Sequence, residues 1–249
     1  MRKKKPFPHS IPPEEEQTGI LLWFQLLQNH GLKLFYSNLL TVLSLLPGFF
    51  CLQLLLDTYD LVFWALGLVC VILAGPSITA LHSVCVRVVH RRPVWVGEEF
   101  GEAWKKMKKI TMELTGILGL LWSVLAYAVY LVILVEGGLS FGHLLLFGIC
   151  AYMLMGVTLF GYEQAALLEL PLAVILKNAV LMIFAGRLRS VFAILVPLAV
   201  FLVCVLLYGY VLFILLAGVM AWTIMTANLI FAPVFSGLFL AEAPDEKEA

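Results

Sequence analysis

The chain has 249 residues, of which 62% are hydrophobic and 13% are charged, and its formal net charge is zero. A typical soluble domain has roughly 45–50% apolar and about 25% charged residues. A soluble domain of this length could not bury so much apolar surface without leaving large exposed patches. The composition therefore excludes an ordinary soluble protein and predicts an all-α membrane protein with one membrane domain, for which we expect no nucleic-acid partner.

The two ends of the chain differ from the rest in being polar. Residues 1–18 combine a basic start with four prolines and the run Glu14–Glu16. Since no apolar stretch or cleavage site of a signal peptide follows, we expect this segment to be retained and disordered. Residues 241–249 form an acidic tail. The five cysteines lie scattered in apolar context without a C-x-x-C pair, which indicates small buried side chains rather than disulfides or metal ligands.

Apolar stretches predict about six transmembrane helices, because a crossing takes about 20 residues. These stretches cover residues 35–56, 61–84, 112–135, 141–161, 191–211 and 218–240. No polar residue separates the last two, so their boundary, a turn near residues 212–217, rests on length alone. The shorter and more polar segment 19–30 predicts an amphipathic helix at the membrane interface, with Trp23 at the level of the lipid headgroups.

The distribution of basic residues predicts the orientation. With six spans, both termini and the connecting segments 85–111 and 162–190 share one side, and all 16 Lys and Arg residues fall on it. The turns on the other side of the membrane carry only three charged residues, Asp57, Asp60 and Glu136. Because basic residues accumulate on the cytoplasmic side, we expect cytoplasmic termini and contact with an anionic inner leaflet.

Each of the two connecting segments contains the pattern of an amphipathic helix. One apolar face is formed by Phe100, Ala103, Trp104, Met107 and Ile110. The other is formed by Leu172, Ile175, Leu176, Ala179, Val180 and Ile183. The first helix also begins with glutamates and ends with lysines, which complements the helix dipole. It suits an anionic membrane surface; the alternative is a helix packed beneath the bundle.

Polar and irregular positions within the spans are functional candidates, because lipid makes unpaired polar groups costly. His82 either binds a ligand or partner, or forms a hydrogen bond between helices. Gly75-Pro76 frees backbone groups, as in the broken helices of transporter sites, or forms a packing kink. Asn228 lies in the last span. Glu113, Glu163 and Gln164 fall near span ends, where we expect them to be solvated.

Catalytic and metal-binding motifs are missing from the sequence. It contains no H-E-x-x-H, G-x-S-x-G or P-loop pattern and no cluster of zinc ligands. No pair of carboxylates recurs at helical spacing deep in a span, which disfavours an ion-coupled transporter. We therefore expect neither an enzyme nor a bound cofactor or metal.

Several short motifs resemble the YesL-like family of bacterial integral membrane proteins. They are Asn38-Leu39-Leu40, Leu45-Leu46-Pro47, Gly75-Pro76-Ser77-Ile78-Thr79-Ala80-Leu81, Glu99-Phe100, Ala103-Trp104-Lys105 and Lys177-Asn178-Ala179-Val180-Leu181. The resemblance extends over nearly the whole membrane region. It implies a small helical protein in the cell membrane of a Gram-positive-type bacterium, associated with sugar importers and sensor kinases. The family supplies no catalytic residues, and the acidic tail departs from the basic end that it would lead us to expect.

The sequence thus favours an accessory or regulatory membrane subunit associated with bacterial carbohydrate uptake. Its partners would be subunits of a sugar importer or a membrane sensor kinase. The alternative is a transporter or permease component that itself carries a sugar or other small solute. The candidate functional residues are Gly75, Pro76, His82, Trp104, Lys105, Lys109, Asn178 and Asn228.

Overall fold

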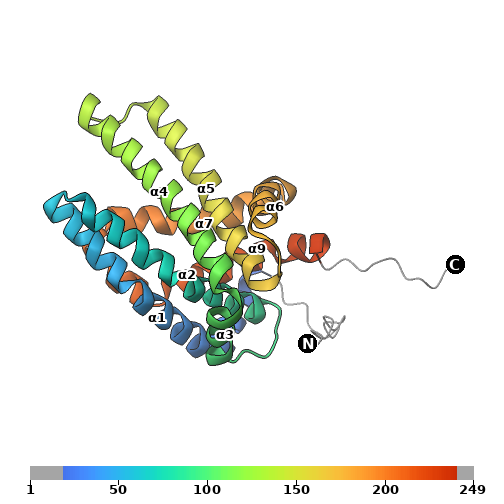
Figure 1. Cartoon of the computed structure of the whole chain (residues 1–249). Coiled ribbons are helices and arrows are strands. Elements are labelled where there is room, and N and C mark those ends of the chain that lie inside the picture. The colour runs from blue at the N-terminus through green and yellow to red at the C-terminus, as the bar shows by residue number, and fades with distance from the viewer. Residues whose placement is uncertain (1–18, 240–249) are drawn as a thin grey trace, which may run out of the picture.

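A computed structural model of the chain describes residues 19–239 and confirms the all-α fold (Figure 1). The helices are α1 (Ile20–Thr58), α2 (Leu61–Val89), α3 (Val96–Glu102), the π-helix η1 (Ala103–Met107), α4 (Lys108–Glu136), α5 (Phe141–Leu167), α6 (Leu172–Ala185), α7 (Leu188–Leu206), the 3-10 helix η2 (Tyr208–Tyr210), α8 (Val211–Leu216) and α9 (Val219–Phe239). The N-terminal segment 1–18 and the acidic tail lie outside the described residues.

The described helices support five or six membrane crossings. Five helical stretches are long and apolar enough to cross a bilayer: α1, α2, α3 to α4, α5 and α7. A sixth crossing is obtained if the bent pair Tyr208–Leu216 and Val219–Phe235 counts as one span. The protein is therefore a multi-pass membrane protein, as its composition predicts.

The first span is longer than predicted. Residues 19–30 do not form a separate interfacial helix, because α1 runs unbroken from Ile20 to Thr58. The early part of α1 packs on the bundle, where Leu26 is buried and the indole of Trp23 donates a hydrogen bond to Thr226 Oγ1 at 2.8 Å. Trp23 is thus held in position by a hydrogen bond to α9.

Small residues bring neighbouring helices close together. In the hairpin of α1 and α2, a Cβ added to Gly48 would lie 3.0 Å from Val71. Where α2 crosses α4, a Cβ added to Gly75 would lie 2.8 Å from the Thr111 carbonyl oxygen, and one added to Gly119 would lie 2.9 Å from Leu68. Without a side chain these backbones approach closely, which is the usual way that membrane helices gain packing energy.

Beyond these crossings the two hairpins diverge (Figure 1). The α1–α2 hairpin and the α4–α5 hairpin meet near α3 and α6 and separate toward their turns. Large apolar side chains are exposed near the α4–α5 turn, among them Leu134, Val135 and Phe141. In a membrane protein such exposed side chains face hydrocarbon.

Helix α9 runs across the bundle and joins its two halves. Ala221, Ile224 and Met225 pack in a buried cluster with residues of α1 and α2. Further along α9, Ala227 and Phe231 pack in a second cluster with residues of α5, α6 and α7. The middle of α9 therefore lies where the two halves of the core meet.

The boundary between the last two predicted spans needs correction. Helix α7 ends at Leu206, five residues before the predicted end, and the chain then forms η2 and α8 before a bend of 72° into α9. Gly218 adopts a positive φ of 96° at this bend, a conformation that glycine adopts without strain. Asn38 donates to the Leu215 carbonyl oxygen at 2.7 Å and accepts from the Ala221 N–H at 3.1 Å. Its carboxamide thereby satisfies backbone groups freed by the bend.

Candidate functional site

The first connecting segment is packed against the bundle. Val94 and Val96, which lead into α3, are buried in the cluster formed with α1, α2 and α9. Helix α3 continues through the π-helix η1 into α4, so the connecting helix and the third span form one helical stretch. The sequence left open whether this helix lies on a membrane surface or packs beneath the bundle; its N-terminal half packs on the bundle.

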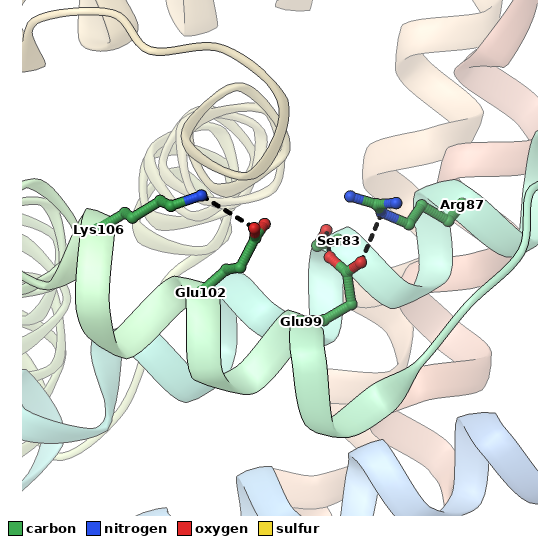
Figure 2. A network of polar contacts seen from close by, with 5 residues as sticks. All are labelled: Ser83, Arg87, Glu99, Glu102 and Lys106. Atoms are coloured by element: carbon green, nitrogen blue, oxygen red, sulfur yellow. Dashed lines mark hydrogen bonds and ion pairs between the residues drawn. The ribbon is translucent and has the colours of Figure 1, made fainter. Parts of the chain in front are cut away.

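A charged contact, which we call the latch, fastens α3 to the end of α2 (Figure 2). Glu99 is 8% exposed; its Oε1 accepts from Arg87 Nε at 2.8 Å and its Oε2 accepts from Ser83 Oγ at 2.5 Å. Both carboxylate oxygens are therefore paired, as a buried charge requires. The sequence pattern placed Glu99 at the start of a helix but gave no sign of its two partners.

Several large polar or aromatic side chains of this segment are exposed. Trp95 is 69% exposed and Trp104 is 42% exposed, and Lys105 and Lys109 are exposed as well. The only ion pair of Lys109 within the described residues is a 4.0 Å contact to Glu113. Indole rings and amines presented together on a fixed helix can bind a membrane surface or an acidic partner.

A pocket of about 460 Å³ lies between the two connecting segments. One wall comes from η1 and the start of α4, and the other from the end of α5 and the turn that leads into α6. Its lining residues are Lys106, Met107, Ile110, Ala165, Leu168, Glu169, Leu170 and Pro171. Single-turn π-helices within longer helices recur at functional sites, and here the π-helix forms part of a pocket wall.

Basic residues surround the end of α2 next to the latch. His90 caps α2, and Arg91 and Arg92 follow it. Burial, and to a lesser degree the Arg92 guanidinium, lower the pKa of His90 below its usual value. Burial and the neighbouring Arg87 also lower the pKa of Arg92. The lowered pKa favours the neutral form of His90, so the positive charge at this end of α2 is carried by its arginines.

A second group of polar side chains is buried within the bundle. His82 is 3% exposed and stacks on Tyr162 of α5, with ring centroids 5.5 Å apart. The Tyr162 hydroxyl lies 2.7 Å from Thr115 Oγ1 of α4, so either oxygen can donate this hydrogen bond. His82 is thus packed between helices, yet its Nδ1 has no hydrogen-bond partner among the described residues.

The prediction that Glu163 and Gln164 are solvated is wrong. Helix α5 continues past the predicted end at residue 161 to Leu167, and Glu163 and Gln164 are only 2% and 0% exposed. Gln164 Nε2 donates to the Phe160 carbonyl oxygen at 3.2 Å and lies 3.3 Å from Met182 Sδ of α6. Glu163 Oε2 and both amide atoms of Asn228 have no partner within the part of the chain that the structure describes.

The remaining predicted candidates lie in different surroundings. Gly75 and Pro76 are buried, and α2 continues unbroken through them. Gly75 lies against Thr111 and Thr115 of α4, so this position forms a close helix crossing. Asn178 is half-buried on α6.

The eight predicted candidates therefore do not form one site. Trp104, Lys105 and Lys109 belong to the exposed side of the first connecting segment. His82 and Asn228 belong to the buried polar group, on α2 and α9. Comparisons with protein-family models, curated proteins and solved structures found no match to this chain.

Proposed function

We propose that this multi-pass membrane protein is an accessory or regulatory subunit that binds a partner through its first connecting segment. The supporting observation is that the latch fixes α3 to the bundle while Trp104 and Lys105 stay exposed on the same helical stretch. A fixed surface loses less conformational entropy on binding than a mobile one does. Tryptophan is among the residues that contribute most to protein interfaces, and the neighbouring lysines would be complementary to acidic groups of the partner.

The motif resemblance suggests the identity of the partner. We propose a subunit of a bacterial sugar importer or a membrane sensor kinase linked to it, bound on the cytoplasmic side of the cell membrane. The cytoplasmic placement rests on the bias of basic residues. The pocket between η1 and the α5–α6 turn belongs to the same connecting segment and would receive an apolar side chain of the partner.

Site-specific photocrosslinking in intact cells tests this function. A photoreactive phenylalanine analogue at position 104 should crosslink to an importer or kinase subunit. The same analogue at Phe141, which is 82% exposed near the α4–α5 turn, serves as the matched control and should not. Sugar uptake should also fall in a strain that carries Trp104→Ala together with Lys105→Ala. Crosslinks to lipid alone, or unchanged uptake after deletion of the whole protein, would contradict the proposal.

The second candidate function is transport of a small solute. It is favoured by the buried polar atoms of His82, Glu163 and Asn228 that have no partner among the described residues, since such groups mark solute and ion pathways in membrane proteins. Against it, the Gly75-Pro76 region forms an unbroken, closely packed helix instead of an unwound binding segment. Proteoliposomes containing the purified protein should take up a sugar if this function holds, and a panel of sugars without uptake would refute it.

A further inference from the structure

Three helices meet at the centre of the bundle, and each meeting is defined by a specific contact. His82 of α2 stacks on Tyr162 of α5. Phe160 of α5 packs on Phe231 of α9, with ring centroids 4.3 Å apart. Cys85 Sγ of α2 lies 3.5 Å from the Ala221 carbonyl oxygen of α9. Helices α2, α5 and α9 thus touch one another pairwise and enclose a junction.

Glu163 lies on the face of α5 that is turned toward this junction. One helical residue turns the chain by about 100°, so Glu163 is about 60° from Phe160 and about 100° from Tyr162, between the two. Phe160 marks the side of α9 and Tyr162 the side of α2. The Glu163 carboxylate therefore projects between α2 and α9.

Asn228 and His82 occupy corresponding positions on the other two helices. By the same geometry Asn228 lies about 60° around the α9 axis from Phe231 and about 20° from Ala221. Asn228 is therefore between the residue of α9 that contacts α5 and the residue that contacts α2. His82 is about 60° from Cys85 and faces α5. Each of the three helices thus directs one polar side chain, at most 3% exposed, toward the same junction.

The polar atoms at this junction lack protein partners. His82 Nδ1, Glu163 Oε2, Asn228 Nδ2 and Asn228 Oδ1 form no hydrogen bond with any described residue. No described basic side chain forms an ion pair with Glu163. A buried carboxylate without a counter-charge and a buried carboxamide without a hydrogen bond are both costly. Unpartnered groups of this kind on three helices, each on the face turned toward the same junction, indicate a ligand that supplies the missing interactions.

We propose that the junction of α2, α5 and α9 binds a small monovalent cation, with the Glu163 carboxylate as its charge partner and Asn228 Oδ1 as a neutral oxygen ligand. Carboxylate and carbonyl oxygens are the preferred ligands of hard cations. The described residues contain no group of three or more His, Cys, Asp and Glu that could hold a metal ion, which argues against a divalent transition metal.

This site is independent of the proposed partner surface. Glu163 and Asn228 are buried inside the bundle, whereas Trp104 and Lys105 are exposed on the first connecting segment. The cation would neutralise the buried carboxylate and stabilise the contact between the two halves of the core that α9 joins. Cation binding can therefore be tested on the purified full chain without any partner.

The experiment measures the thermal unfolding midpoint, Tm, in detergent at constant ionic strength. Sodium, potassium, lithium and the large cation N-methylglucamine are compared at fixed pH between 5 and 8. We expect one alkali cation to raise Tm saturably over N-methylglucamine, by about 3–6 °C at ten times its dissociation constant. Glu163→Gln should abolish this rise, and Asn228→Leu should shift its midpoint to higher cation concentration. Glu113→Gln, on an exposed carboxylate of α4, is the matched control and should keep the rise.

A binding measurement on the unaltered protein covers the case in which a variant fails to fold. Radioactive sodium or rubidium should bind with about one ion per chain and be displaced by the unlabelled ion. The proposal is overturned if Tm is the same in all four salts, if it depends on pH alone, or if the Glu163→Gln variant keeps the cation response. The absence of saturable binding to the unaltered protein would overturn it as well.

Discussion

The two connecting segments share a sequence pattern but are held to the bundle in different ways. The first, with α3 and η1, is fastened by the charged latch of Glu99, Arg87 and Ser83. The second, with α6, is fastened by apolar burial, since the Ile175 side chain is fully buried. Gln164 Nε2 also makes a weak 3.5 Å contact to the Ile175 carbonyl oxygen. The first attachment thus adds a charged contact to the apolar packing of Val94 and Val96, whereas the second depends on packing.

The exposed faces of the two segments also differ in polarity. The first exposes lysines together with Trp95 and Trp104, which suits headgroups or a protein partner. The second is a 14-residue apolar helix that exposes Leu181 and Phe184, which suits hydrocarbon. An apolar helix of this length is too short to span a bilayer. A pattern of apolar residues at helical spacing therefore identifies an amphipathic helix but not the medium on its outer side.

The largest loss of unfolding free energy should come from removing a packing contact of α6. Ile175→Ala takes a fully buried side chain out of the cluster that joins α2, α4, α5 and α6. Truncation of a buried isoleucine typically costs about 2–5 kcal/mol of unfolding free energy. Unfolding by SDS in mixed micelles, followed by tryptophan fluorescence, measures this change. Val174→Ala, at a neighbouring 37% exposed position, is the control and should cost much less. Equal losses in the two variants would show that α6 is not held by its buried face.

The sequence predicted the helices well and their ends poorly. Runs of apolar residues determine where a chain can enter lipid, so the spans beginning near Leu61 and Phe141 were placed within a residue of the observed helix starts. The ends depend on packing that hydropathy does not encode. Thus α5 continues through Glu163 because neighbouring helices bury that residue. The bend before α9 depends on Asn38, a residue of α1 that lies more than 170 positions away along the chain.

The candidate sites were predicted in part. Trp104 and its neighbouring lysines are recognisable from amphipathic spacing and lie on an exposed surface. The latch and the polar junction could not be predicted, because each combines residues from separate helices. A single Glu within a predicted helix gives no sign of a partner such as Arg87, 12 positions earlier.

A smaller loss of unfolding free energy is expected when the charged contact of the first segment is removed. Glu99→Ala leaves Ser83 and Arg87 without their acceptor, but Arg87 is 37% exposed and can be rehydrated. We therefore expect a loss of about 1–2 kcal/mol, below the cost of a fully buried pair. The loss should be local, since few other polar contacts hold α3. Hydrogen exchange followed by mass spectrometry should show faster exchange of the α3 amides.

Two controls make this result specific. Glu98→Ala removes the adjacent carboxylate, which is exposed, and should leave exchange in α3 unchanged. The amides of α6 should be unaffected in both variants, because α6 is held by packing. Exchange that accelerates equally in α3 and α6 would mean that the two segments respond as one unit, which would remove the distinction between them.

The smallest effect should come from the exposed charges next to the pocket. Lys106 pairs with Glu102 at 2.9 Å, but the two side chains are 64% and 54% exposed, so water and salt screen the interaction (Figure 2). Lys106→Ala should change the unfolding free energy by less than about 0.5 kcal/mol. The substitution nevertheless removes a charge from the pocket wall. If the pocket adjoins a partner surface, the variant should weaken crosslinking from position 104 while its SDS unfolding curve stays unchanged. A variant that loses stability and keeps full crosslinking would instead assign Lys106 a structural role in holding η1.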